Sequence, residues 1–167
     1  MFTHSFTLKM KHTDMAGVAF FASYYVMAHD VYELALESVG EPLPPWIHLA
    51  PMPLARSEAH YHAPMRLGDE VCVCFGVKHI SKRSFELAYE FWVKPLMPLT
   101  WESSPAEPPS PLPEGERVWQ RAATLSTVHV AIDPKRGKSV ALPERFKLAL
   151  ERLGPITEGA HPSQLTS

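Results

Sequence analysis

Asp14 is the residue of this sequence that is best placed to do chemistry. It lies in a short segment, residues 13–17, ahead of a long predicted helix, and Phe20 and Phe21 stand near the start of that helix. Aspartate is ionised at neutral pH, and a carboxylate between a helix N-terminus and apolar walls can act as a nucleophile or as a general base. An aspartate ahead of a helix is also a common cap or turn residue. The sequence leaves the choice between nucleophile and general base open.

The start of the helix would supply the second half of an acyl-transfer site. The first N–H groups of a helix lack partners within the helix, and together with the helix dipole they stabilise negative charge on a nearby carbonyl oxygen. A well-placed donor of this kind contributes about 3–4 kcal/mol in known acyl-transfer sites. Asp14 and the helix start together therefore predict chemistry at a thioester or similar carbonyl.

Four further polar residues are weaker candidates. Glu58 is a lone acid in a strand-like segment, where it fits either a supporting catalytic role or a solvated ion pair. His60 and His62 would share one face of that strand, but two ligands do not make a metal site, so we expect no metal. His29 projects from the predicted helix, where it fits a polar contact to a hydroxyl of an aromatic acyl group or an ordinary surface histidine.

The composition predicts one folded domain that does not bind nucleic acid. The chain has 167 residues, 46% of them hydrophobic, and its 16 Lys and Arg against 18 Asp and Glu give a net charge of −2. This length suits a single core. Nucleic-acid binding calls for a clustered surplus of Lys and Arg, which this balance does not favour.

Cysteine usage and apolar runs indicate the compartment. Cys72 and Cys74 lie two residues apart in a strand-like segment, so we expect core thiols rather than a disulfide framework or a zinc site. The sequence has no run of 18 apolar residues and no signal-peptide pattern at its start, so we expect a cytoplasmic protein without a membrane partner. The G-x-S-x-G, P-loop and G-x-G-x-x-G motifs are absent, which disfavours serine hydrolases and nucleotide-binding proteins.

The periodicity predicts a strand, a long helix and then four strands. Apolar residues alternate over 2–10 and recur every three or four residues over 23–39, where Ser23 would cap the helix and Gly40 would end it. Further strands are expected over 54–63, 70–80, 85–93 and 117–132, and a closing helix over 143–153. This order predicts an α+β fold, with an antiparallel sheet of about five strands that buries one face on one long central helix.

Prolines mark the segments outside this pattern. Residues 95–116 hold seven prolines, so we expect a long mobile loop inserted between two strands. Residues 41–53 are a second Pro-rich connection whose position the sequence does not give. The predicted organisation is a single domain over 1–153 followed by a flexible tail over 154–167.

Four segments resemble a known family. Residues 11–21 (KHTDMAGVAFF) are similar to the T-D-x-x-G-V-V-Y signature of the hot-dog-fold acyl-CoA thioesterases of the 4-hydroxybenzoyl-CoA thioesterase type. The resemblance extends through residues 63–69 (APMRLGD), Ser84–Phe85 and 137–143 (GKSVALP), and covers most of residues 3–146 outside the insert. It implies a hot-dog fold and the hydrolysis of an acyl-CoA thioester without a cofactor. It also favours the catalytic interpretation of Asp14.

Within the family, residues 27–33 (MAHDVYE), with Phe21 where many relatives carry histidine, look most like the 1,4-dihydroxy-2-naphthoyl-CoA thioesterases of phylloquinone and menaquinone synthesis. The resemblance implies that the backbone N–H of Phe21 donates to the carbonyl oxygen and that Gly17 leaves room for the acyl group. It carries over no role for the Phe21 side chain.

Coenzyme A would need cations for its 3′-phosphate and pyrophosphate. The candidates are basic or hydroxyl side chains in loops, namely Arg66 and the predicted hairpin Ser81, Lys82, Arg83 and Ser84, with Lys135, Arg136 and Lys138 in addition. Each of them fits a solvated turn equally well.

The predicted single-layer sheet leaves an edge and an outer face uncovered. Trp92 and Trp119 lie opposite the other apolar residues of their strands, so we expect a homo-oligomer, a dimer with paired edge strands extended to a dimer of dimers. Active sites of the family lie between subunits, which implies that a second copy helps to enclose Asp14.

The first functional hypothesis is hydrolysis of an aromatic acyl-CoA, 1,4-dihydroxy-2-naphthoyl-CoA above all. A close variant is hydrolysis of short acyl-CoA or acyl carrier protein thioesters. The rival from another class is a hot-dog module that binds acyl thioesters without cleaving them. Asp14 with Gly17 after it speaks against that rival.

Overall fold

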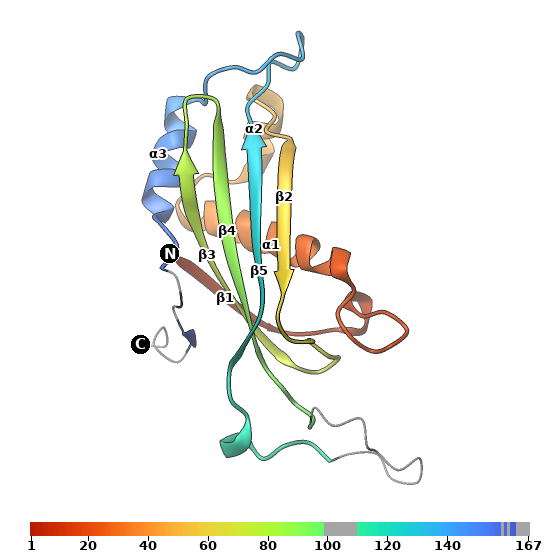
Figure 1. Ribbon diagram of the computed structural model, residues 1–167. Coiled ribbons are helices and arrows are strands. Elements are labelled where there is room, and N and C mark those ends of the chain that lie inside the picture. Colours follow the sequence, from red (N-terminus) through yellow and green to blue (C-terminus); the bar gives the residue numbers. More distant parts are fainter. Residues whose placement is uncertain (99–109, 158, 160, 163–167) are drawn as a thin grey trace.

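One antiparallel sheet and three helices make up the fold. In a computed structural model of the chain, which describes residues 1–98, 110–157, 159 and 161–162, the strands lie in the order β1-β3-β4-β5-β2 (Figure 1). The strands are β1 (Phe2–Thr7), β2 (Leu54–Tyr61), β3 (Glu70–Ile80), β4 (Ser84–Lys94) and β5 (Gln120–Val130). The helices are α1 (Phe21–Ser38), α2 (Leu43–Leu49) and α3 (Glu144–Leu153), with short 3-10 turns at Met10–His12 and Glu114–Glu116. The predicted α+β order is confirmed.

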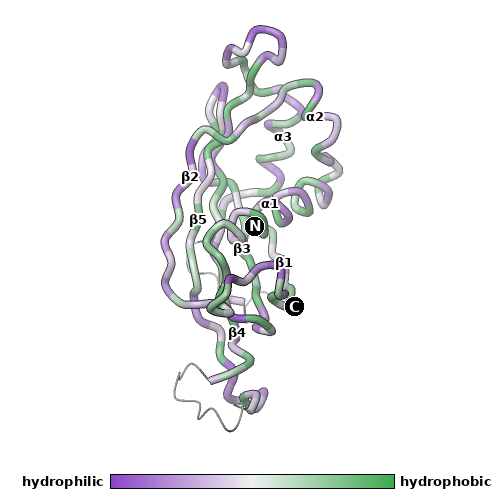
Figure 2. Tube along the Cα trace, turned by 90° about the vertical axis from the view of Figure 1, so that its right-hand side faces the viewer, coloured by the Kyte–Doolittle hydropathy of each residue, from purple (hydrophilic) through white to green (hydrophobic). Residues whose placement is uncertain are grey.

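The core lies between α1 and one face of the sheet. Seen edge-on, the sheet forms one layer and the three helices lie on one side of it (Figure 2). Val71, Val73 and Phe75 of β3 are fully buried there, as are Val31 and Ala35 of α1. Strand residues alternate between the two faces of a sheet, so the predicted alternation of β3 places these side chains against the helix.

The N-terminal cap of α1 lies three residues earlier than the sequence predicts. The first residue of α1 is Phe21, and Phe20 is the N-terminal cap with extended backbone and no capping hydrogen bond from a side chain. The Phe20 N–H donates to the carbonyl of His12, and the Phe20 carbonyl accepts the N–H of Ser23. Ser23 is therefore a buried residue of the first turn and not the cap. The predicted end is close, because α1 ends at Ser38 and Gly40 follows with φ +76°.

Two other predictions of local structure were wrong. The first strand ends at Thr7 because Leu8 turns into the core, and Met10 belongs to a 3-10 turn and is 76% exposed. The Pro-rich connection over 41–53 contains α2, which has prolines in its first turn, where a missing N–H costs nothing. Trp46 of α2 is buried against Phe146 of α3.

The outer face of the sheet is partly covered by the segment that follows α3. The N–H of Val77 donates to the carbonyl of Gly154 at 2.9 Å. Gly76 has no side chain, and a Cβ there would lie 2.3 Å from the backbone nitrogen of Ile156. Further on, the ring of His161 packs on Trp92 at 5.0 Å. The described part of the expected flexible tail thus lies against β3 and β4.

The ends of the Pro-rich insert are held together, while residues 99–109 of the predicted mobile loop lie outside the described residues. The N–H of Leu112 donates to the carbonyl of Leu96 at 2.9 Å, and Nε of Arg117 donates to the carbonyl of Pro95 at 2.9 Å. Glu114 pairs with Lys94 and with Arg117. This neck leads the chain out of β4 and back into β5.

Strand β2 forms an open edge of the sheet. It pairs with β5 on one side, and every residue of β2 except Ala59 is exposed. The predicted core thiols Cys72 and Cys74 are buried in β3, away from this edge. Among the described residues, none of the helices has the length and apolar content needed to cross a bilayer.

Candidate active site

Asp14 sits in a tight turn whose two arms pair with each other. Thr13 and Ala19 form an antiparallel bridge, and the N–H of Asp14 donates to the carbonyl of Val18 at 2.9 Å. Oδ1 of Asp14 accepts the N–H of Ala16 at 2.8 Å, and the side chain is exposed. Gly17 has φ +73° with nothing within 4 Å of a built Cβ, so it is needed here for the left-handed turn and leaves open space beside it. The turn presents one free carboxylate oxygen outward.

The start of α1 lies beside this turn and carries an unused donor. No hydrogen bond leaves the backbone N–H of Phe21 within the described part of the chain, while its carbonyl accepts the hydroxyl of Tyr61 at 3.5 Å. A hollow of about 340 Å³ opens here, lined by residues 18–19, 21, 24 and 61–64. We name it the α1 hollow. Val18 belongs both to this hollow and to the turn that holds Asp14, so the backbone of the turn adjoins the hollow, although Asp14 itself does not line it.

The same corner includes the loop before β3. Val18 bridges to Arg66, and the N–H of Leu67 donates to the carbonyl of Gly17 at 3.4 Å. The loop itself is braced by Asp69, which accepts the N–H groups of Arg66 and Leu96. Arg66 is thus the predicted coenzyme A contact that the structure brings close to Asp14 and Gly17.

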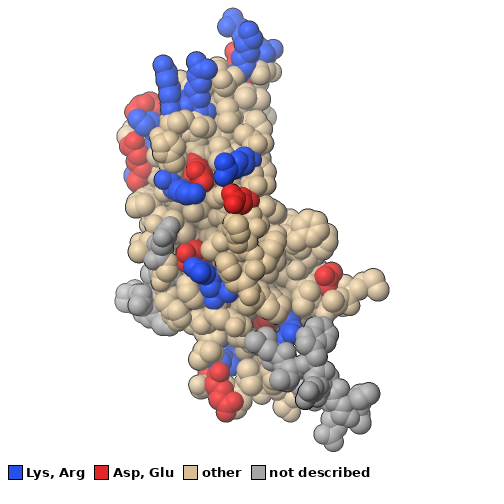
Figure 3. All heavy atoms as spheres, viewed as in Figure 1, with Lys and Arg blue, Asp and Glu red and all other residues tan. Residues whose placement is uncertain are grey.

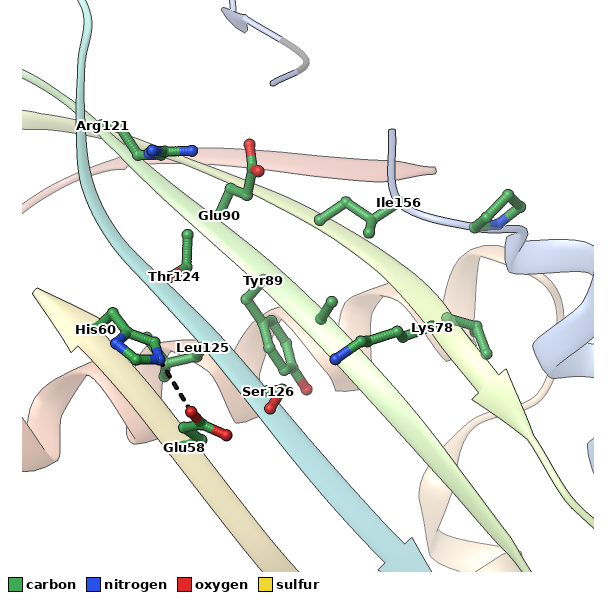
Figure 4. A pocket seen from close by; sticks show the side chains of 13 residues that line it. Glu58, His60, Lys78, Tyr89, Glu90, Arg121, Thr124, Leu125, Ser126 and Ile156 are labelled. Atoms are coloured by element: carbon green, nitrogen blue, oxygen red, sulfur yellow. Dashed lines mark hydrogen bonds and ion pairs between the residues drawn. The ribbon is translucent and has the colours of Figure 1, made fainter. Parts of the chain in front are cut away.

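Glu58 lies on the opposite face of the sheet. It accepts hydrogen bonds from His60 at 3.0 Å and Arg56 at 3.1 Å, and these two partners lower the pKa of its carboxyl, His60 first. Figure 4 shows Glu58 and His60 side by side on the near side of the sheet, with the α1 ribbon behind it. They line a hollow of about 500 Å³ on the outer face, where charged and apolar side chains are mixed. The structure does not bring Glu58 to Asp14.

His29 also lies outside the α1 hollow. It stands eight residues after Phe21, about 12 Å along the helix axis. Its side chain is exposed, and its ring lies 6.2 Å from His129 and 6.5 Å from Tyr32. A contact between His29 and a substrate would require a ligand that extends along α1.

The predicted hairpin contacts for coenzyme A lie at the far end of the sheet. β3 begins next to the Arg66 loop and runs 11 residues to the hairpin, which spans about 35 Å. The hydroxyls of Ser81 and Ser84 bond each other at 2.7 Å, so they close the hairpin. Arg83 donates to Ser139 at 3.2 Å, which ties the hairpin to the next basic turn.

Basic side chains gather at that end of the molecule, at the top of Figure 3. We name them the basic cluster: Lys82, Arg83, Lys135, Arg136 and Lys138. Within one chain, the basic cluster and Asp14 lie at opposite ends of the strands.

The expectation that His60 and His62 share one face of a strand is wrong, because β2 ends at Tyr61. His60 lines the outer-face hollow and His62 lines the α1 hollow. Among the residues that the structure describes, no three His, Cys, Asp or Glu side chains are placed to hold a metal ion.

Tyr24 and Tyr61 were missed as site residues by the sequence analysis. Their rings pack edge to face at 5.0 Å beside Phe21. The helical spacing of Tyr24 indicates a core residue, which it is at 3% exposure. Tyr61 could have been found from its position, because it ends β2 two residues before the APMRLGD segment begins.

Comparison with known proteins agrees with this geometry. The model of the thioesterase superfamily matches residues 16–98, about half of the chain. A 1,4-dihydroxy-2-naphthoyl-CoA hydrolase from Microcystis aeruginosa is 26% identical over 148 residues, which cover 87% of this chain and 90% of the relative. A hydrolase of the same name from Nostoc punctiforme is 25% identical over 161 residues, covering 95% of this chain and 93% of the relative.

Solved structures give the same result. The crystal structure of a 1,4-dihydroxy-2-naphthoyl-CoA thioesterase from Synechocystis has a TM-score of 0.70 at 26% identity, covering 91% of this chain and 96% of that one. The 4-hydroxybenzoyl-CoA thioesterase from Pseudomonas sp. strain CBS-3 has a TM-score of 0.66 at 14% identity, covering 89% and 97% of the two chains. This second likeness bears on the fold alone. With a five-stranded sheet wrapped on α1 and these matches, the chain belongs to the thioesterase superfamily and has its hot-dog fold.

Proposed function

We propose that this thioesterase hydrolyses aromatic acyl-CoA, with 1,4-dihydroxy-2-naphthoyl-CoA as the first substrate to test. The observation that carries the proposal is the corner where Asp14, the unused N–H of Phe21 and the α1 hollow meet. The choice of acyl group is supported by the names of the relatives at about 25% identity and by the aromatic residues around the hollow. Hydrolysis would release 1,4-dihydroxy-2-naphthoate and free coenzyme A.

Each half of the corner has one task in this reaction. The thioester carbonyl oxygen accepts the N–H of Phe21 at the positive end of α1, where the developing negative charge is stabilised. The free oxygen of Asp14 either attacks the carbonyl carbon or takes a proton from the attacking water. In both cases the C–S bond breaks, and the thiolate of coenzyme A leaves and is protonated. In the first route the acyl group is then bound to Asp14 as a mixed anhydride, which water hydrolyses to the free acid and the regenerated carboxylate. Gly17 keeps the space beside the carboxylate open for the acyl group.

A second copy of the chain would enclose this site. Asp14 is exposed in one chain, and electrostatic stabilisation is far stronger where water is excluded. Exposed apolar side chains surround it, including Phe20 at 43%, Phe21 at 61% and Tyr61 at 49%. They lie next to the open edge of β2, so a second chain that pairs along this edge would cover them.

Antiparallel pairing of two β2 strands would also bring the basic cluster to the reaction. Leu54 begins β2 at the hairpin end of the sheet and Tyr61 ends it at the Asp14 end. An antiparallel partner therefore places its hairpin end, with its basic cluster, beside Tyr61 of the first chain. Coenzyme A held in this way would have its thioester at one chain and its phosphates at the other.

The deciding experiment measures release of the coenzyme A thiol from a panel of naphthoyl, benzoyl and aliphatic acyl-CoA thioesters. We expect the wild type to cleave the naphthoyl thioester best, and Asp14→Asn to lose about 10²–10⁴-fold in kcat with its fold unchanged. Asp30→Asn is the matched control, because Asp30 is an exposed carboxylate of α1 that does not line the α1 hollow.

Other results would point elsewhere. Tight binding of the thioester without thiol release by the wild type would favour the binding module over the enzyme. Preferred cleavage of aliphatic or carrier-protein thioesters would favour the alternative substrates. Full activity of Asp14→Asn would remove Asp14 from the mechanism.

A further inference from the structure

The α1 hollow differs in chemistry from the other hollows of the described chain. It is lined by apolar and aromatic residues, among them Phe21, Tyr24 and Tyr61. The outer-face hollow has charged side chains such as Glu58 and Lys78, and a third hollow beside α3 is formed mainly by Arg145 and its charged neighbours. A ligand fragment that enters the α1 hollow therefore leaves water for an apolar, ring-rich surface.

Tyr61 is the ring of this surface that is both fixed and accessible. One side of it packs edge to face on Tyr24 at 5.0 Å with 70° between the ring planes. Tyr24 in turn packs on Phe91 in the core at 5.3 Å and is 3% exposed. Tyr61 itself is 49% exposed. Because one side of the Tyr61 ring is fixed by packing and the ring is still accessible, it can distinguish acyl groups by their shape.

The other aromatic residues of the corner are less suited to this task. Tyr24 lines the hollow but is only 3% exposed, so it offers little surface to a ligand. Phe20 does not line the hollow. Phe21 does, but its ring packs at 4.4 Å on Phe20, which is itself 43% exposed, whereas Tyr61 packs on a buried ring. The Tyr61 hydroxyl adds a constraint, because it donates to the carbonyl of Phe21 at 3.5 Å. Burial and the nearby Tyr25 raise the pKa of Tyr61, so this donor stays protonated at neutral pH.

We propose that Tyr61 is the specificity-determining residue that makes this site prefer flat aromatic acyl groups over aliphatic ones. The inference rests on the proposed function, since it assumes that the thioester lies at the start of α1. The acyl ring packs against the open face of Tyr61, in the offset or edge-to-face arrangements that aromatic pairs prefer. An aliphatic chain gains burial there but not the ring-to-ring contact.

The test compares Tyr61→Leu with Tyr61→Phe on paired substrates. For each variant the ratio of kcat/KM for benzoyl-CoA or naphthoyl-CoA to that for hexanoyl-CoA is measured by thiol release. We expect Tyr61→Leu to lower this ratio about three- to tenfold, mainly through the aromatic substrates, and Tyr61→Phe to keep it within about twofold of wild type. Tyr61→Met provides a second non-aromatic variant if the leucine protein fails to fold.

Tyr25→Leu is the matched control. Tyr25 is the neighbouring tyrosine of α1 and is not among the residues that line the hollow. An unchanged ratio in Tyr61→Leu and Tyr61→Met, or an equal fall in Tyr25→Leu, would overturn the inference while leaving hydrolysis intact. A wild type that cleaves no thioester of the panel would instead contradict the proposed function. A wild type that prefers hexanoyl-CoA would contradict both the proposed aromatic substrate and the role of Tyr61.

Discussion

Strands β3 and β2 belong to the same sheet but are used in opposite ways. β3 is buried without interruption from Val71 to Val77, because α1 and α3 cover one face and the segment after α3 covers the other. β2 is exposed at every position except Ala59. The fold is thus held together along β3, and its edge at β2 is left open beside Asp14. The stable part of the molecule and the proposed reactive part are separated within one sheet.

The largest effect is expected from removing a core ring of β3. Phe75→Ala should lower the free energy of unfolding by about 3–5 kcal/mol, because Phe75 is fully buried and its loss leaves a cavity. Leu54→Ala at the start of β2 should cost less than about 1 kcal/mol, since Leu54 is 47% exposed. Urea unfolding at one protein concentration measures both. Equal losses would contradict the contrast between the two strands.

A smaller effect is expected where the chain crosses over β3. Gly76→Val would put a side chain where the backbone of Ile156 lies, so we expect a loss of about 1–3 kcal/mol and faster tryptic cleavage after Arg152. Gly115→Val is the control, because a Cβ at Gly115 meets nothing within 4 Å. Unchanged stability and cleavage in Gly76→Val would mean that the segment after α3 is not held by this contact.

The open edge of β2 should respond in assembly rather than in folding. The N–H of His62 donates to the carbonyl of Ala122 in β5. Successive residues of a strand direct their N–H groups to opposite sides, so Glu58 directs its N–H toward β5 and Ser57 directs its N–H away from the sheet. Ser57→Pro should therefore keep the pairing with β5 but lower the mass found by analytical ultracentrifugation. Glu58→Pro removes a donor to β5 and should instead destabilise the fold. An unchanged mass in Ser57→Pro would argue against a partner along β2.

The smallest expected effect is a change at His129 in how the free energy of unfolding depends on pH. Its Nδ1–H donates to the carbonyl of Met52 and its Nε2 accepts the hydroxyl of Thr127, and burial lowers its pKa below the ordinary value of 6.5. As the pH falls, His129 is therefore protonated in the unfolded chain before it is protonated in the folded one. The contribution of neutral His129 to the free energy of unfolding is full above about pH 6.5 and is lost as the pH falls toward the lower pKa of the folded protein.

His129→Gln should flatten this part of the curve of unfolding free energy against pH between about pH 7 and pH 5. Part of the slope remains in His129→Gln because burial lowers the pKa of His12 as well. An identical slope in wild type and His129→Gln would exclude this role.

The sequence predicted the well-covered strand best. The predicted bounds of β3 are the observed ones, because a strand buried on both faces leaves a continuous apolar run. The start of α1 was displaced, since its cap is held by a backbone contact to His12 that no local pattern encodes. α2 was missed because prolines usually interrupt a helix, although they are tolerated in its first turn, where the prolines of α2 lie.

The candidate site was predicted in part for similar reasons. Asp14, Gly17 and Phe21 are near each other in the chain, so a short turn brings them together. Glu58 and Tyr61 are three residues apart in a strand and must therefore face opposite sides, which the period of two could have indicated. The distance of the hairpin from Asp14 follows from the length of β3 and from how the strands connect. A list of basic residues does not contain that information.

The neck of the Pro-rich insert has a practical consequence. Arg117 and Glu114 clamp the returning chain to Pro95 and Lys94, so the points where the chain leaves and re-enters the sheet are fixed to each other. An inserted domain whose own two ends are adjacent would therefore add little to the entropic cost of closing this loop. A small fluorescent or affinity module grafted between Leu96 and Leu112 would thus report on this enzyme without tagging either terminus.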